Sequence, residues 1–229
     1  MRVADIMTRD VVTVGPDADI SEIVTLLVRN NISAVPVVQD GLVLGVVSEG
    51  DLLRRAEIGT EPKRSRWLEF ISTSTASAAD YIRSHARKAS EIMTRPAVTV
   101  NADASIADVA SLLESRGIKR APVVRDGRLV GIVSRGNILR ALASRLDWAP
   151  ARDNADDRQI QDALYRELSG KSWAPAVARC SIVVQDGVVH LWGYLDDPVQ
   201  VQAVVVAAEN IPGVKQVVDH TVRHLPYGV

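Results

Sequence analysis

The chain has one cysteine, no long apolar run and almost no net charge. With only Cys180 it cannot form an internal disulfide, and that thiol has no acidic or cysteine partners at zinc-ligand spacing. No apolar run approaches the roughly 20 residues of a membrane-spanning helix. Charges at Arg2, Asp5, Arg9 and Asp10 interrupt the apolar core that an N-terminal signal peptide needs. These absences predict a cytoplasmic protein without a metal site.

The charge balance and the lack of catalytic motifs exclude further classes. The 27 Lys and Arg nearly cancel the 28 Asp and Glu, so the chain has no overall attraction to nucleic acid or to an anionic membrane. Residues 1–150 carry 20 − 18 = +2 and residues 151–229 carry 7 − 10 = −3. The four histidines have no nucleophile or carboxylate at a signature spacing, and no phosphate loop or dinucleotide fingerprint is present. We therefore predict a protein that is not an enzyme, needs no cofactor and binds no nucleic acid.

What the chain does contain is an internal repeat. Residues 5–54 align without a gap with residues 91–140, and about half of the aligned positions are identical. The identical segments include "IMTR" at 6–9 and 92–95, "VTV" at 12–14 and 98–100, and "PVV" at 36–38 and 122–124. Two copies this similar must have the same fold.

Each copy predicts the order strand, helix, strand, strand, helix. In the first copy, residues 11–14 are a short β-branched run, and residues 17–31 place apolar side chains at helical spacing after an acidic start. Residues 34–48 are two apolar runs around an Asp-Gly pair, which is a strong hairpin signal. A last helix begins at Ser48, or at Ser134 in the second copy.

The doubled pattern I-x-x-x-P-V-V, D-G, G-h-V-S-x-x-[DN] resembles the CBS domain, and the tandem resembles a Bateman module over roughly residues 1–146. The resemblance implies an α+β fold in which two β-α-β-β-α repeats, residues 1–56 and 89–147, form a pseudosymmetric pair. It also implies a cleft with two potential sites for an adenosine-containing ligand, and association as a homodimer. Between the repeats, residues 57–88 predict a linker of two short helices.

The composition changes again after residue 148. A helix, two strands, a further helix and a last strand are predicted, and "GVVHLWG" at 187–193 and "PGV" at 212–214 resemble the BON domain. BON domains are associated with phospholipid surfaces or with partner proteins. Residues 148–229 are therefore predicted to be a small α-β-β-α-β domain that contacts a protein partner or a lipid surface.

The stretch "GVVSEGD" at 45–51, repeated as "GIVSRGN" at 131–137, permits two interpretations. Ser48 with Asp51 three residues later fits a helix cap, because each side chain can satisfy a backbone donor. The same helix start, with a serine and a carboxylate, can also bind a ribose diol or a phosphate. The family resemblance favours the ligand and gives Asp51 the ribose hydroxyls. Asn137 has only one accepting oxygen, so its amide nitrogen needs an acceptor of its own.

The resemblance also implies that each site combines residues from both repeats. One site would contain Thr13, Ile32, Ser33, Lys119, Arg120, Ser134 and Asn137. The other would contain Thr99, Ile118, Ala34, Ser48 and Asp51. The first set has the cations that a phosphate needs and the second has the ribose carboxylate, so we expect phosphorylated nucleotides at the first site and less charged adenosyl ligands at the second.

The sequence thus predicts a ligand-sensing regulatory protein. The CBS pair would bind AMP, ADP, ATP or S-adenosylmethionine, and the last domain would transmit the result to a partner. Two alternatives stay open: a constitutive scaffold whose serine and Asp or Asn pairs are only helix caps, and a lipid-associated protein that acts through its last domain.

Overall fold

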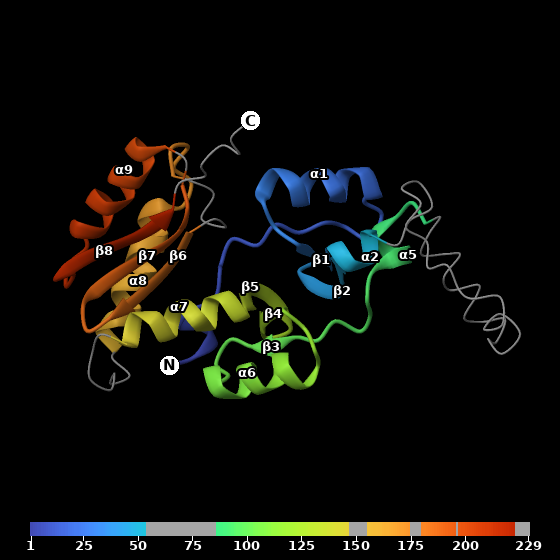
Figure 1. Ribbon diagram of the computed structural model, residues 1–229, viewed down its shortest axis with the longest axis horizontal. Helices are drawn as coiled ribbons and strands as arrows, with labels where there is room; N and C mark the ends of the chain where they lie inside the picture. The colour runs from blue at the N-terminus through green and yellow to red at the C-terminus, as the bar shows by residue number, and fades with distance from the viewer. Residues whose placement is uncertain (54–85, 147–154, 175–179, 196, 223–229) are drawn as a thin grey trace, which may run out of the picture. The chain divides into compact units, whose positions relative to one another are not determined.

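The computed structural model describes residues 1–53, 86–146, 155–174, 180–195 and 197–222 (Figure 1). Almost all of the predicted helical linker at 57–88 lies outside these residues. The chain forms two compact units, one of Val12–Val98 and one that joins Met1–Val11 to Thr99–Val229. Among the described residues, no helix is both long enough and apolar enough to cross a membrane.

The unit Val12–Val98 contains the body of the first repeat. Its elements are α1 (Ile20–Asn30), β1 (Ala34–Gln39), β2 (Leu42–Ser48), α2 (Glu49–Leu52) and α5 (Ala89–Ile92). Strands β1 and β2 form the predicted antiparallel hairpin. Asp40 and Gly41 have φ angles of 53° and 82°, and positive φ at both residues is the requirement of a tight hairpin turn. The apolar faces of α1 and of the hairpin meet in one core.

The other unit contains the helices and the hairpin of the second repeat, and its elements are η1 (Val3–Asp5), β3 (Val100–Asn101), α6 (Ile106–Ser115), β4 (Arg120–Arg125), β5 (Arg128–Ser134) and α7 (Arg135–Leu146). The strand predicted at 11–14 is not formed, because the first repeat has at this place only an isolated parallel bridge between Val14 and Val37. Strands β4 and β5 pair as β1 and β2 do, with the same irregularity in register after the fourth residue of the first strand. The equal register confirms that the repeat in the sequence is a repeat of structure.

The two "IMTR" segments each pack on the other copy of the repeat. Ile6 and Met7 are buried in the core that contains β4 and β5, and Ile92 and Met93 are buried in the core of the first repeat. Glycine makes this packing possible, because a Cβ on Gly45 would lie 2.6 Å from the Met93 sulfur. Each repeat core is therefore completed by a segment that is distant in the sequence.

The BON region has the predicted order of elements. They are α8 (Ala155–Leu168), β6 (Cys180–Gln185), β7 (Val188–Tyr194), α9 (Pro198–Glu209) and β8 (Gln216–Val222). β7 is the central strand, antiparallel to β6 and parallel to β8. Alternate strand residues share a core with α8 and α9 that includes Ile160, Leu164 and Leu191. The mixed α+β class predicted from the sequence is confirmed.

Candidate functional site

The first motif, "GVVSEGD", ends in Asp51, a carboxylate that uses one of its two oxygens in the helix cap. At the start of α2, the Asp51 Oδ2 atom accepts hydrogen bonds from the Ser48 backbone N–H at 2.9 Å and from the Ser48 hydroxyl at 2.7 Å. Both side chains are half-buried. Within the described part of the chain, no partner is recorded for the second carboxylate oxygen of Asp51. This oxygen can accept a further hydrogen bond from a hydroxyl group.

In the second motif, "GIVSRGN", both the oxygen and the nitrogen of the Asn137 side chain form hydrogen bonds within the same unit. The Asn137 Oδ1 atom accepts from the Ser134 backbone N–H at 3.0 Å and from the Ser134 hydroxyl at 2.6 Å. The Asn137 amide donates to the carbonyl of Ile6 at 2.9 Å, and its side chain is buried, with the residue 3% exposed. The acceptor that the asparagine amide needs is thus a backbone carbonyl of the "IMTR" segment. Aspartate could not make this bond when ionised, because it has no donor.

The other predicted residues of the first repeat lie around the Ser48 motif or next to its hairpin. The Ser33 carbonyl accepts from the Glu49 N–H at 3.0 Å, and Ala34 pairs with Ser48 in the hairpin. Thr13 is exposed and precedes Val14, whose N–H and carbonyl bond to Pro36 and Val38 in β1. Ser33, Ala34, Ser48 and Asp51 are therefore neighbours where the hairpin meets α2. Ile32 is half-buried against the same core.

The second repeat holds its predicted residues in the same local arrangement. The Lys119 carbonyl accepts from the Arg135 N–H at 3.1 Å, and Arg120 pairs with Ser134 in the β4–β5 hairpin. Lys119 is exposed, and Arg120 and Ile118 are half-buried. Thr99 is exposed next to β3. The assignment of all these residues to two sites that each combine both repeats remains a prediction.

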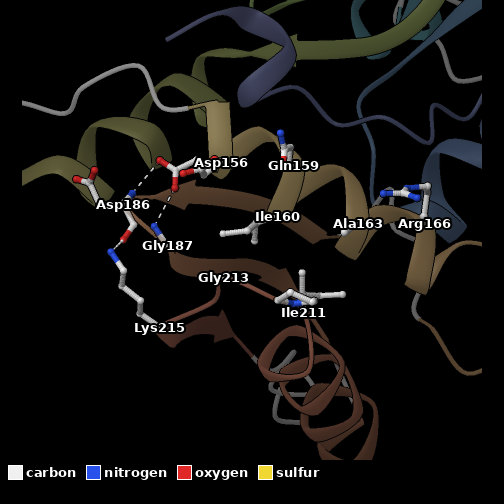
Figure 2. A pocket seen from close by; sticks show the side chains of 12 residues that line it. Asp156, Gln159, Ile160, Ala163, Arg166, Asp186, Gly187, Ile211, Gly213 and Lys215 are labelled. Carbon is white, nitrogen blue, oxygen red and sulfur yellow. Dashed lines mark hydrogen bonds between the residues drawn. The ribbon is translucent and has the colours of Figure 1, made fainter.

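A cavity that sequence reasoning missed lies in the BON region (Figure 2). It has a volume of about 590 Å³. Its lining comes from α8, the β6–β7 turn and the segment before β8, and consists of Asp156, Asp157, Gln159, Ile160, Ala163, Arg166, Asp186, Gly187, Ile211, Pro212, Gly213 and Lys215. The Asp157 carboxylate accepts from the backbone N–H groups of Asp186 and Gly187, each at 2.8 Å. The adjacent Asp156 and Asp157 in the first turn of α8 are the feature of the sequence that could have indicated this bond to the β6–β7 turn.

Two histidines of the BON sheet also meet, although the sequence did not predict it. The parallel register of β7 and β8 places Trp192 opposite His220, and their rings stack with centroids 3.8 Å apart. The His190 Nδ1 and His220 Nε2 atoms are 3.1 Å apart. In the described residues, no group of three or more metal-ligating side chains is found.

Comparisons with known proteins agree with this organisation. The CBS domain model matches residues 3–57 and 89–144, and the BON domain model matches residues 156–222. A protein of Methanocaldococcus jannaschii, MJ1426, is 31% identical over 154 residues, which are 62% of this chain and 91% of the relative. CBSX2 of Arabidopsis thaliana is 30% identical over 152 residues, 61% of this chain and 62% of the relative. A crystal structure of CBSX2 in complex with AMP matches 63% of this chain and 98% of its own, with 29% identity and a TM-score of 0.55.

Two CBS repeats and a following BON domain define the class of protein. The chain belongs to the CBS domain-containing proteins, in which it has a tandem CBS pair followed by a C-terminal BON domain.

Proposed function

We propose that this protein is a non-enzymatic regulatory sensor whose CBS pair binds an adenosine-containing ligand. The observation that carries the proposal is the carboxylate of Asp51, whose second oxygen has no partner among the described residues and lies beside Ser48 at the end of the β1–β2 hairpin. A carboxylate in this position can accept hydrogen bonds from both hydroxyls of a ribose. The AMP complex of CBSX2, a structural relative at 29% identity, supports the choice of ligand class.

The same geometry supports an unequal pair of motifs. Because the Asn137 side chain is buried and bonded to Ser134 and Ile6, we propose that ribose is held chiefly at Asp51. Lys119 and Arg120, which belong to the other proposed site, remain the proposed partners of phosphate there, with AMP, ADP or ATP more dependent on them than S-adenosylmethionine. The BON domain would carry the response to a partner protein or a lipid surface.

A ligand panel tests this function. Isothermal titration calorimetry with AMP, ADP, ATP and S-adenosylmethionine should detect binding to the intact protein. At about 100 times its dissociation constant, a true ligand also stabilises the protein by about 2.7 kcal/mol. Asp51→Ala should weaken binding by roughly tenfold or more, since a hydrogen bond to a charged group contributes about 1.5–3 kcal/mol. Lys119→Ala with Arg120→Ala should weaken ATP more than S-adenosylmethionine.

One observation favours the scaffold alternative. Asn137 acts in this structure as a structural link, and Ser48 with Asp51 can cap α2 in the same way without any ligand. Absence of binding by every ligand of the panel would support the scaffold and contradict the sensor.

We further propose that the protein is a homodimer. Leu139 and Leu142 on α7 are 63% and 52% exposed, and Leu53, the repeat equivalent of Leu139, is 61% exposed. A second copy that covers these leucines would remove apolar surface from water. Sedimentation or light scattering should give a dimer mass for the natural chain and a monomer mass for Leu139→Lys with Leu142→Lys. A monomer mass for the natural chain would contradict the proposal.

A further inference from the structure

The N-terminal segment Asp5–Arg9 contacts both the second CBS repeat and the BON domain. On the repeat side, Thr8 exchanges two backbone hydrogen bonds with Ile132, at 2.9 and 2.8 Å. The Ile6 carbonyl accepts the amide of Asn137. These bonds fix the segment to strand β5 and to the start of α7.

On the BON side, Arg9 of the same segment contacts three residues of α8. The Arg9 guanidinium donates to the Asp162 carboxylate at 2.6 Å and to the Gln161 Oε1 atom at 3.1 Å. It also lies over the ring of Tyr165, 4.5 Å from the centroid, which is within cation–π distance. The Arg9 side chain is 27% exposed and the Asp162 side chain is 54% exposed, so the guanidinium is the better shielded of the two charges.

Gln161 is the centre of this contact. It is 3% exposed, and its Nε2 atom donates both to the Asp5 carbonyl at 2.7 Å and to the Ile182 carbonyl at 2.8 Å. One side chain thus joins the N-terminal segment, α8 and the first strand of the BON sheet. Arg158 adds an ion pair to the Asp5 carboxylate at 3.1 Å. A displacement of the segment must break or rearrange the part-buried hydrogen bonds of Gln161 and Arg158 to Asp5, which are costly to leave unmade.

The chain itself joins the segment to Thr13, one of the proposed ligand-binding residues. Thr13 follows Arg9 by four residues and precedes Val14, which is bonded to β1. We propose that Asp5–Arg9 couples ligand binding at the first CBS repeat to the BON domain, with Gln161 and Asp162 of α8 as the receiving residues. This inference rests on the proposed function, because it requires a ligand at the CBS pair. Coupling is reciprocal, so a change on α8 must alter ligand affinity.

The test compares two conservative changes on the same helix. Asp162→Asn weakens the Arg9 contact, whereas Glu167→Gln removes the charge that pairs with Lys171, just beyond the end of α8. Hydrogen–deuterium exchange of the full chain is measured with and without AMP, and AMP affinity is measured by calorimetry. We expect AMP to change exchange in Ala155–Leu168 of the natural chain and of Glu167→Gln. Asp162→Asn should lose most of that change and shift the AMP dissociation constant by roughly fivefold or more, the lower end of ordinary coupling factors.

The outcomes separate the two proposals. If AMP binds the natural chain but leaves exchange in α8 unchanged, the coupling is wrong and the ligand function stands. If Asp162→Asn behaves as Glu167→Gln does in both measurements, the Arg9 contact is not the route and the inference is again wrong. If AMP and the other ligands of the panel do not bind the natural chain, the proposed function fails and the coupling fails with it.

Discussion

Exchanging Asp51 and Asn137, the last residues of "GVVSEGD" and "GIVSRGN", should separate the structural role of this position from its role in ligand binding. Asn137→Asp and Asp51→Asn both keep the size of the side chain and the oxygen that accepts from the serine. In Asn137→Asp the carbonyl of Ile6 loses its donor, and a carboxylate enters a position that is 3% exposed. In Asp51→Asn a half-buried carboxylate becomes a neutral amide. The two hydrogen bonds from Ser48 to this side chain are kept but become weaker, because their acceptor is no longer charged.

The expected magnitudes follow from these contacts. A buried polar group left without its partner costs about 1–3 kcal/mol, so Asn137→Asp should lower the free energy of unfolding by at least that amount. For a chain of this length, 1 kcal/mol corresponds to about 2–4 °C in melting temperature, which gives a drop of roughly 2–12 °C. Asp51→Asn should change stability by no more than about 0.5 kcal/mol, as surface changes usually do, while it weakens ligand binding.

Thermal and urea unfolding of the two variants measure the difference. The pH dependence of Asn137→Asp gives an internal check, because burial raises the pKa of the new carboxyl group and its protonated form can donate to the Ile6 carbonyl. Because the folded pKa of this carboxyl group would lie above the unfolded one, the loss of unfolding free energy should be smallest at acid pH. It should grow as pH rises through the folded pKa. If Asn137→Asp unfolds at the same temperature as Asp51→Asn at neutral pH, the structural role of Asn137 is refuted.

Three other predictions concern glycine packing, the Cys180 thiol and the Glu91 carboxylate. Gly131→Ala places a methyl group 3.0 Å from the Thr8 carbonyl, and Gly45→Ala places one 2.9 Å from the Thr94 carbonyl. Each variant should lower the free energy of unfolding in urea by about 1–3 kcal/mol. Gly15 has open space around it, so equal stability of Gly15→Ala and Gly45→Ala would contradict this prediction. Burial, and to a smaller extent the Asp219 carboxylate, raises the pKa of the Cys180 thiol to about 11; a thiol reagent at pH 8 should therefore react only on unfolding, and rapid reaction of the folded protein would show an accessible thiol. Hydrogen bonds from the Lys88 and Arg87 backbone N–H groups lower the pKa of Glu91; its stabilisation should be complete above the ordinary glutamate pKa and be lost as pH falls through the lowered value, and an NMR titration midpoint at or above the ordinary value would contradict the contact.

The repeat in the sequence was sufficient to predict most of the fold. The alternation of apolar residues, the Asp-Gly turns and the helical spacing at 17–31 predicted the β1–β2 and β4–β5 hairpins and their helices, and the structure has them. These features are local, so a single sequence contains them. The family model confirms the same two repeats and the BON domain.

What the sequence could not predict depends on packing between distant segments. The alignment of residues 5–54 with 91–140 counts each "IMTR" as the start of its own copy, yet each is buried on the opposite copy. Sequence similarity is the same for either packing and cannot choose between them. The contact of His190 with His220 likewise depends on the parallel register of β7 and β8, which no spacing within one strand reveals.

The change from Asp51 to Asn137 has a structural reason as well as a chemical one. In the second repeat, the "IMTR" segment is the one that continues to Arg9 and bonds to α8. An amide at 137 fixes that segment to the repeat, and a carboxylate could not. The first repeat has the other "IMTR" segment, Ile92 to Arg95, on its core, and its aspartate makes no recorded bond to it in the described residues. We therefore propose a division of roles: the Asp51 oxygen that has no partner among the described residues is offered to a ligand, and Asn137 uses the same position to hold the segment that reaches the BON domain.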